Sequence, residues 1–256
     1  MPAPDPSSAA DAPAAGPSAA PRESAGGLTG TPEVTARHGT ALFAASVALL
    51  AALGLMGLVF TSSPPPQLDG HLDVLLDGFV RYRWGFFGAA LIAPTFVAML
   101  TLLLHVGGVP ASSVRRSLGT TLLGGYTAIA TVAYTSQFTI LPRLLTRDPE
   151  LAAVWYLHDV DSIPYALDLA GYALLGIAVI VLASTLIGRT RRLTLIGWLL
   201  LVMGALSLAA LGLHGAGANT AASIATASSG ACTLPVAVLG VVEGRAVGRN
   251  GGSVGG

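Results

Sequence analysis

The sequence contains no lysine, a single cysteine and little charge of either sign. Only 10% of its 256 residues are charged, whereas a soluble domain carries about 25%. A hydrophobic share of 53% cannot be covered by so little polar surface, so lipid must surround much of the chain. The lone thiol, Cys232, cannot form an internal disulfide. A formal net charge of zero, with no large basic cluster, argues against nucleic-acid binding.

The sequence also lacks a catalytic or cofactor motif of high specificity. No Cys/His pair has the spacing of a zinc finger. The glycine-rich turn at 215–218 has neither the preceding soluble strand nor the following lysine of a phosphate loop. We therefore expect no cofactor and no catalytic residue, and the sequence alone names no reaction.

Long apolar runs are what the sequence has in abundance. They lack the alternating pattern of a membrane barrel, and in hydrocarbon each segment must satisfy its own backbone hydrogen bonds, so helices are predicted. The fold class expected is therefore all-α: a polytopic membrane protein with a six-helix transmembrane bundle. The six spans, each about the length of a bilayer crossing, are 40–60, 85–106, 118–141, 163–187, 193–213 and 221–242.

The arginines indicate the orientation of this bundle. Nine of the 13 lie in the two tails and in the connectors 107–117 and 188–192, and four lie in the remaining connectors. Because cationic residues stay on the cytoplasmic side, we expect both termini in the cytoplasm and the protein in the cell's inner (plasma) membrane. Residues 1–36, rich in Pro, Ala and Ser, are predicted to be a disordered tail, 37–243 the membrane domain and 244–256 a flexible Gly-rich tail.

Two outer connectors have the pattern of short interfacial helices. In 68–83, apolar and acidic residues each recur at helical spacing, which is typical of an amphipathic helix on the membrane surface. In the second, Asp148 can cap a helix whose first residue is Pro149, and Trp155 and Tyr156 suit the headgroup layer. The sequence thus predicts a two-helix lid on the outer side.

Asp168 is the most informative single residue, because it lies about a turn and a half inside the fourth span. A carboxylate at that depth usually faces the bundle interior or a wet cavity. Tyr165 and Tyr172 share its helical face, and Asp161 lies further out. Two interpretations stay open: a site for a small polar ligand or cation from the outer side, or a structural group paired with an arginine such as Arg143 or with a tyrosine.

The third span is the most polar of the six. Threonines recur at every fourth position from Thr127 to Thr139, and their hydroxyls can bond back to their own helix. Tyr134 and Gln137 lie at a depth similar to that of Asp168, which predicts hydrogen bonds, or a ligand pocket, between the third and fourth spans. The candidate ligand-binding residues are Asp168, Tyr165, Tyr172, Asp161, Tyr134, Gln137 and Arg143.

Histidine is the only enzymatic signal. His71, His158 and Asp161 are all expected on the outer side, where imidazole and carboxylate could bind zinc and activate a water. Their spacing matches no specific zinc motif, so solvated interfacial histidines are the competing interpretation.

One stretch resembles a known family. Residues 162–172, Ser-Ile-Pro-Tyr-Ala-Leu-Asp-Leu-Ala-Gly-Tyr, resemble the segment that opens the fourth span in a family of bacterial six-helix membrane proteins whose function is unassigned. Chain length and helix number resemble that family too. The resemblance implies a shared fold and a shared position for Asp168, and it implies no reaction. The long Pro/Ala-rich tail departs from the family's compact form.

Three function classes remain. The favoured one is a non-enzymatic binding, sensing or accessory protein with an outward-facing polar pocket around Asp168. The alternatives are a small-solute or proton-coupled transporter and a membrane-embedded metal-dependent hydrolase. A transporter is expected to have ionisable groups along the whole membrane depth. The inner halves of the spans lack acids and the sequence shows no internal repeat, which argues against this class. The expected partners are the lipid bilayer and a small polar ligand or cation; the oligomeric state is left open.

Overall fold

The computed structural model describes residues 32–62 and 72–252, and within these ranges the fold is all-helical, with no strand. Five of its helices contain segments long and apolar enough to cross a membrane: α1, α2, α6, α7 and α8. The chain therefore fits a multi-pass membrane protein. The helices are α1 (Pro32–Ser62), α2 (Leu72–Val106), α3 (Val114–Thr139), α4 (Leu141–Leu145), α5 (Pro149–Val154), α6 (Ile163–Leu186), α7 (Arg191–Gly215) and α8 (Asn219–Gly252).

Helix α3 covers most of the predicted third span but is less apolar than the other five long helices. It is nevertheless 26 residues long, or about 39 Å at 1.5 Å per residue. Several of its hydroxyls are satisfied within the helix, as expected. Thr127, Thr135 and Thr139 each donate to the carbonyl four residues earlier, over 2.5–2.9 Å.

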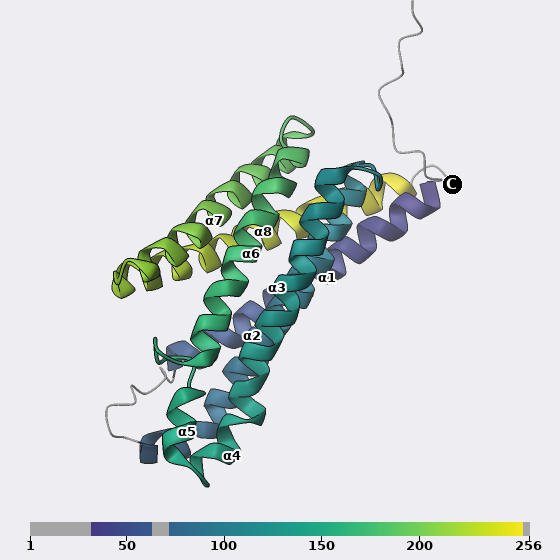
Figure 1. Ribbon diagram of the computed structural model, residues 1–256. Helices are drawn as coiled ribbons and strands as arrows, with labels where there is room; N and C mark the ends of the chain where they lie inside the picture. Colours follow the sequence, from purple (N-terminus) through teal and green to yellow (C-terminus); the bar gives the residue numbers. More distant parts are fainter. Residues whose placement is uncertain (1–31, 63–71, 253–256) are drawn as a thin grey trace, which may run out of the picture.

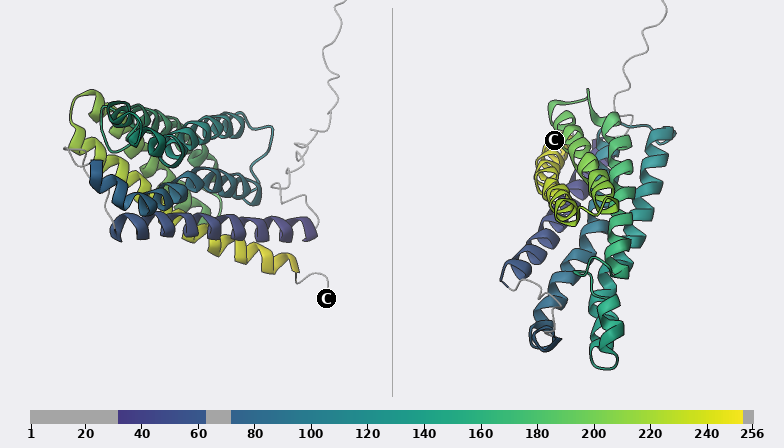
Figure 2. Two further views of the ribbon diagram at one scale, coloured as in Figure 1. Left: turned by 90° about the horizontal axis from the view of Figure 1, so that it is seen from below. Right: turned by 60° about the vertical axis from the view of Figure 1, so that its left-hand side comes forward.

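The six long helices form a closed ring in chain order (Figures 1 and 2). Each of α1, α2, α3, α6, α7 and α8 packs against the next, and α8 returns to α1. The start of α1 lies beside the end of α8, where a Cβ atom on Gly39 would lie 2.6 Å from the amide nitrogen of Gly248. The start of α3, with Arg115, and the turn after α6, with Arg189, lie at this same end, which we call the arginine-rich end. Helices α4 and α5 lie at the opposite end.

Glycines let neighbouring helices approach at backbone distance. A Cβ on Gly244 of α8 would lie 2.6 Å from the amide nitrogen of Phe43 in α1. In α6 and α7, a Cβ on Gly204 would lie 2.7 Å from the carbonyl oxygen of Gly176. Close backbone contacts of this kind hold helices together inside lipid, where burial of apolar side chains drives little association.

This packing corrects both predicted tails. Helix α8 continues to Gly252, so residues 244–252 are helical where a flexible tail was expected. Two of the glycines that suggested flexibility, Gly244 and Gly248, instead lie against α1. Helix α1 begins at Pro32, so residues 32–36 of the expected disordered tail are helical too; residues 1–31 lie outside the described ranges.

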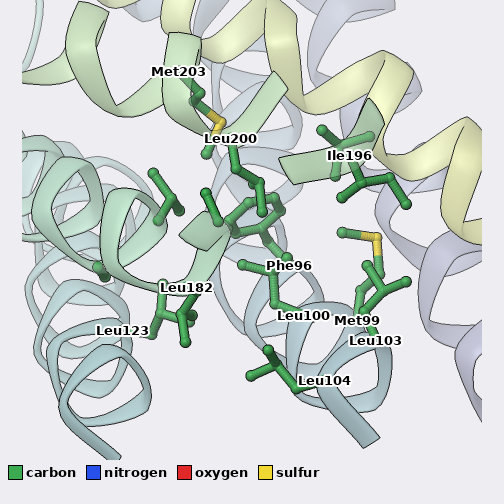
Figure 3. Packing of buried hydrophobic residues seen from close by; sticks show 14 of the residues in the cluster. Phe96, Met99, Leu100, Leu103, Leu104, Leu123, Leu182, Ile196, Leu200 and Met203 are labelled. Carbon is green, nitrogen blue, oxygen red and sulfur yellow. The ribbon is translucent and has the colours of Figure 1, made fainter. Parts of the chain in front are cut away.

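The interior of the ring is apolar towards the arginine-rich end (Figure 3). Phe96, Met99 and Leu100 of α2 fill its centre and are at most 1% exposed. Leucines from α3 and α6 and the side chains of Ile196 and Leu200 of α7 surround them. Side chains of α2 therefore fill the middle of the ring at this end.

The predicted outer helices differ from the observed ones. Residues 72–83 are helical, but they are the first turns of α2 rather than a separate helix, and 68–71 lie outside the described ranges. No proline and no Ser/Thr cap stands between the two predicted segments, so nothing ends the helix there. Asp148 does cap α5, accepting a hydrogen bond from the Leu151 amide over 3.0 Å, with Pro149 first in the helix. Tyr156 is 1% exposed and packs inward rather than facing headgroups.

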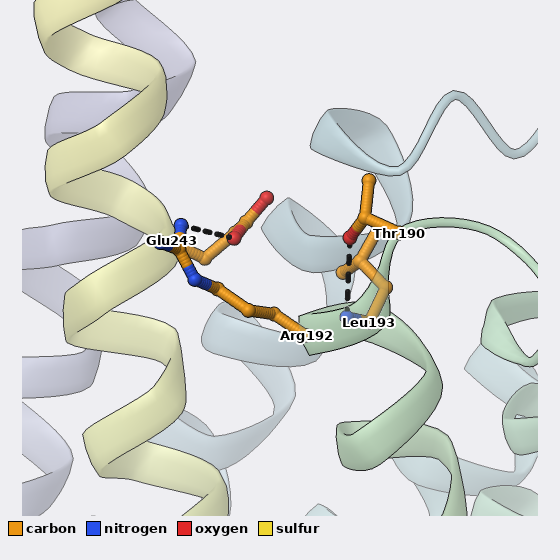
Figure 4. A network of polar contacts seen from close by, with 4 residues as sticks. All are labelled: Thr190, Arg192, Leu193 and Glu243. Atoms are coloured by element: carbon orange, nitrogen blue, oxygen red, sulfur yellow. Dashed lines mark hydrogen bonds and ion pairs between the residues drawn. The ribbon is translucent and has the colours of Figure 1, made fainter.

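The start of α7 is tied to the helices around it (Figure 4). The Thr190 hydroxyl caps the helix by accepting a hydrogen bond from the Leu193 amide over 3.3 Å. Arg192 forms an ion pair of 3.4 Å with Glu243 of α8. Because Arg192 is half exposed, this pair contributes little stability and serves mainly to orient α7 against α8.

Candidate functional site

A cavity of about 570 Å³ lies inside the helix ring, beyond the apolar core on the side away from the arginine-rich end. All six long helices contribute to its wall. Apolar side chains such as Leu50, Ile92 and Phe96 make up most of the lining, and polar groups are confined to two patches. This combination of a mostly apolar wall with a few polar groups is typical of small-molecule sites.

The cavity opens sideways between α1 and α8. These helices touch closely near Gly244 and separate further along, where no atom lies within 4 Å of a Cβ built on Gly54. Lining residues on both sides of this opening, Gly54, Ala227 and Leu234 among them, have exposed surface. An opening at the outer mouth beside Asp161 was expected, whereas the observed opening faces the side of the bundle.

Three tyrosines and Asp168 form the first polar patch. Tyr126 and Tyr134 come from α3 and Tyr172 from α6, and all three line the cavity. The Tyr126 and Tyr172 ring centroids are 6.4 Å apart. The Tyr134 hydroxyl lies near both the Asp168 carboxyl group and the Tyr172 hydroxyl. The Tyr172 hydroxyl points across the cavity, 3.8 Å from a Cβ built on Gly230 of α8.

Asp168 is incompletely satisfied in this patch. Its Oδ1 atom is buried and has no hydrogen-bond partner among the described residues. An unmet buried carboxyl oxygen costs free energy comparable to that of a lost hydrogen bond, and more if the group is charged. The carboxyl group therefore stands behind the tyrosine hydroxyls with capacity for one more donor.

The second polar patch, across the cavity, satisfies its own hydrogen bonds. The hydroxyls of Ser207 and Ser229 are 2.7 Å apart, and Ser229 also donates to the Met203 carbonyl over 3.1 Å. Thr226 donates to the Ala222 carbonyl over 3.0 Å. The serine hydroxyls bind α7 to α8 and Thr226 bonds within α8, so of these polar groups it is Asp168 that lacks a partner.

Of the predicted ligand-binding residues, the structure brings Asp168, Tyr134 and Tyr172 together. Tyr165 shares their helix face but contacts the His214 ring of α7 instead, at 5.4 Å between centroids. Asp161 lies in the exposed loop before α6, where its backbone amide donates to the Asp159 side chain over 3.0 Å. Neither lines the cavity.

Gln137 and Arg143 also lie apart from the cavity lining. Gln137 is fully buried and accepts hydrogen bonds from the Tyr82 hydroxyl at 3.0 Å and the Leu157 amide at 3.1 Å. It donates to the Trp155 carbonyl at 2.9 Å. Gln137 thus ties α3 to α2 and to the segment after α5. Arg143 lies on α4, and among the described residues it forms no ion pair with Asp168.

The predicted metal set is only partly described. His71 lies outside the described ranges, and the described residues contain no group of three metal-ligating side chains. His158 stands among aromatic rings, with centroids 5.4 Å from Tyr156, 5.6 Å from Phe86 and 6.1 Å from Phe60. Residue 158 is exposed on one side, but its ring lies among these aromatic side chains, and loss of water around the ring lowers the pKa of His158 to about 4. Desolvation likewise raises the pKa of the Tyr156 hydroxyl.

Spacing along single helices did not reveal the whole site. Tyr126 belongs to the cluster, and its place in the most polar span was the only signal for it. The wall from α1 and α8 has no signal in the sequence, because it depends on how these two helices diverge. Comparisons with protein-family models, curated proteins and solved structures found no match, so the function rests on this geometry.

Proposed function

We propose that this protein is a six-span inner-membrane protein that binds a small amphiphilic ligand in the cavity of its helix ring. The observation that carries the proposal is the buried, unpartnered Oδ1 of Asp168 behind three cavity-lining tyrosines. The apolar wall suits a hydrocarbon part, and the tyrosine–carboxylate patch suits a polar end that donates hydrogen bonds or carries positive charge. The sideways opening gives access from the membrane.

The positions of the two ends support six crossings rather than five. The start of α1 and the end of α8 lie side by side, which requires an even number of crossings if all long helices traverse the same layer. Helix α3 is long enough to be the sixth crossing, and its place in the ring between α2 and α6 supports this. The arginine excess puts both ends in the cytoplasm, and the family resemblance, a prediction from residues 162–172, agrees with this topology.

Binding is favoured over catalysis and transport by the chemistry of the wall. Among the described lining residues there are hydroxyl groups, but no histidine and no carboxylate that could act as a general base; Asp168 itself lies behind the lining tyrosines. Between Asp168 and the arginine-rich end, the described interior is the apolar core of Figure 3, which offers no path of ionisable groups for a coupled transporter.

Photolabelling tests this proposal. The purified full-length protein in lipid nanodiscs would be exposed to a decyl amine that carries a photoactivated diazirine, and the labelled peptides would be mapped by mass spectrometry. We expect labels concentrated on the cavity faces of α1 and α8, near 50–56 and 226–234. Asp168→Asn should reduce cavity labelling about tenfold, as expected for loss of a charge-assisted hydrogen bond.

The matched control is Asp161→Asn, which removes a carboxylate from the exposed loop of the same region and should leave labelling unchanged. Tyr172→Phe, which deletes one cavity hydroxyl, should also weaken labelling while the helix ring stays folded. Labels spread evenly over lipid-facing surfaces, or cavity labelling that Asp168→Asn and Tyr172→Phe leave intact, would refute the proposed site. Unfolding of Asp168→Asn together with unaffected Tyr172→Phe would assign Asp168 a structural role.

A further inference from the structure

A second concave site lies at the arginine-rich end, outside the helix ring. A groove of about 600 Å³ separates the start of α3 from the end of α6. Two guanidinium groups line it, from Arg115 of α3 and Arg189 in the turn after α6. The hydroxyls of Ser113, Ser184 and Thr185 lie along the same groove.

The two arginines of the groove have N–H groups that are not bonded to other described residues. Among the described residues, Arg115 makes one long contact, 3.5 Å to the Ser184 hydroxyl. Arg189 is held in place from one side, since it donates to the carbonyl of Thr185 over 2.8 Å and to that of Gly107. Its remaining N–H groups have no hydrogen-bond partner among the described residues, so a ligand can accept from them. A fixed guanidinium beside an adjustable one suits the bidentate recognition of a phosphate group.

Among the described residues, no carboxylate lines the groove. Of the acids whose side chains the structure describes, Glu243 is the one near this end, and it pairs with Arg192. Asp168 lies inside the ring. The other acids with described side chains, Asp148, Glu150, Asp159 and Asp161, lie in the segments around α5 at the opposite end. The groove is therefore open to an anion.

An apolar track leads away from the groove along α3. Val114 lines the groove and is 80% exposed, and Leu118, one turn further into the span, is 48% exposed. A free inorganic anion would make no contact with this apolar surface, whereas acyl chains would pack along it. We propose that the groove binds the phosphate of an anionic phospholipid, with Arg115 and Arg189 on the phosphate oxygens and the chains along Val114 and Leu118.

Thermal unfolding of the purified full-length protein in a neutral detergent tests this. Dioctanoyl phosphatidylglycerol should raise the unfolding temperature in a saturable way, because a ligand of the folded state stabilises it. Dioctanoyl phosphatidylcholine and inorganic phosphate, at the same ionic strength, should raise it much less. Arg115→Gln should weaken the apparent affinity for phosphatidylglycerol about tenfold, as for one charge-assisted hydrogen bond.

Arg191→Gln is the matched control. Arg191 is exposed at the start of α7, at the same end of the ring but outside the groove, so its loss removes equal charge and should leave the affinity unchanged. An equal loss of affinity for both variants would show that the effect depends only on overall charge, and it would overturn the proposal. Equal stabilisation by phosphatidylcholine would overturn it too, and equal stabilisation by phosphate would assign the groove to a soluble anion. Asp168→Asn should leave this binding intact, which separates it from the cavity.

Discussion

At the scale of single residues, buried polar groups divide into those that hold the fold and those left for a ligand. Gln137 belongs to the first kind, since its amide meets Tyr82, Trp155 and Leu157. Asp168 belongs to the second. The sequence placed both at a similar depth, and depth alone could not separate them because their neighbours come from segments remote in the chain.

Replacement of Gln137 by leucine should destabilise the protein strongly. It leaves the Leu157 amide and the Trp155 carbonyl without their partner, at a cost of about 1–3 kcal/mol for each buried group. Thermal unfolding in detergent should show a clear fall in midpoint. Thr135→Val on the same helix removes a hydroxyl that bonds only within α3 and should change the midpoint little; equal effects from the two variants would contradict this role of Gln137.

His158 should make stability depend on pH. Its pKa is lowered to about 4 in the folded protein, against about 6.5 in an unfolded chain. Between these values the unfolded chain binds more protons, so stability should fall as pH drops from about 6.5 towards 4. His158→Phe keeps a ring among Phe60, Phe86 and Tyr156 and should flatten this part of the profile. An unchanged slope between pH 7 and 5 would show that other groups cause it.

At the scale of helices, backbone contacts decide where elements begin and end. Periodicity and apolar length located the cores of all the long helices. The sequence did not predict the ends of α8 and α2 correctly, because the composition at each end is compatible with two different structures. Glycines near 244–252 suggest disorder in isolation, but against α1 they permit close packing. Likewise 72–83 has an amphipathic pattern, and only the continuous backbone shows it to be part of α2.

Gly244→Ala should therefore weaken the contact between α1 and α8. The added methyl would lie 2.6 Å from the Phe43 amide nitrogen and 2.9 Å from the Gly39 carbonyl oxygen, and backbone atoms cannot move aside without parting the helices. We expect a loss of about 1–3 kcal/mol, as for overpacked cores, measured as a lower unfolding midpoint. Gly212→Ala, where nothing lies within 4 Å, should be neutral or slightly stabilising. A neutral Gly244→Ala would contradict the close contact.

At the scale of the whole molecule, the ring creates both proposed sites. The cavity forms inside it where α1 and α8 diverge, and the groove forms outside it between α3 and α6. The sequence predicted apolar helices and the polar character of the third span. It could not predict the cavity wall, because that depends on which non-consecutive helices become neighbours, above all on the return of α8 to α1.

The central claim is that α3 crosses the membrane as part of this ring, with the arginine-rich end in the cytoplasm. Single cysteines replacing Ser112, Glu150 and Arg191, each in a Cys232→Ser background, would be treated with a membrane-impermeant maleimide on intact cells or spheroplasts. We predict labelling of Glu150→Cys in intact membranes, and labelling of Ser112→Cys and Arg191→Cys only after permeabilisation. Labelling of Ser112→Cys and Glu150→Cys from the same side would mean that α3 does not cross. The reverse pattern would invert the orientation.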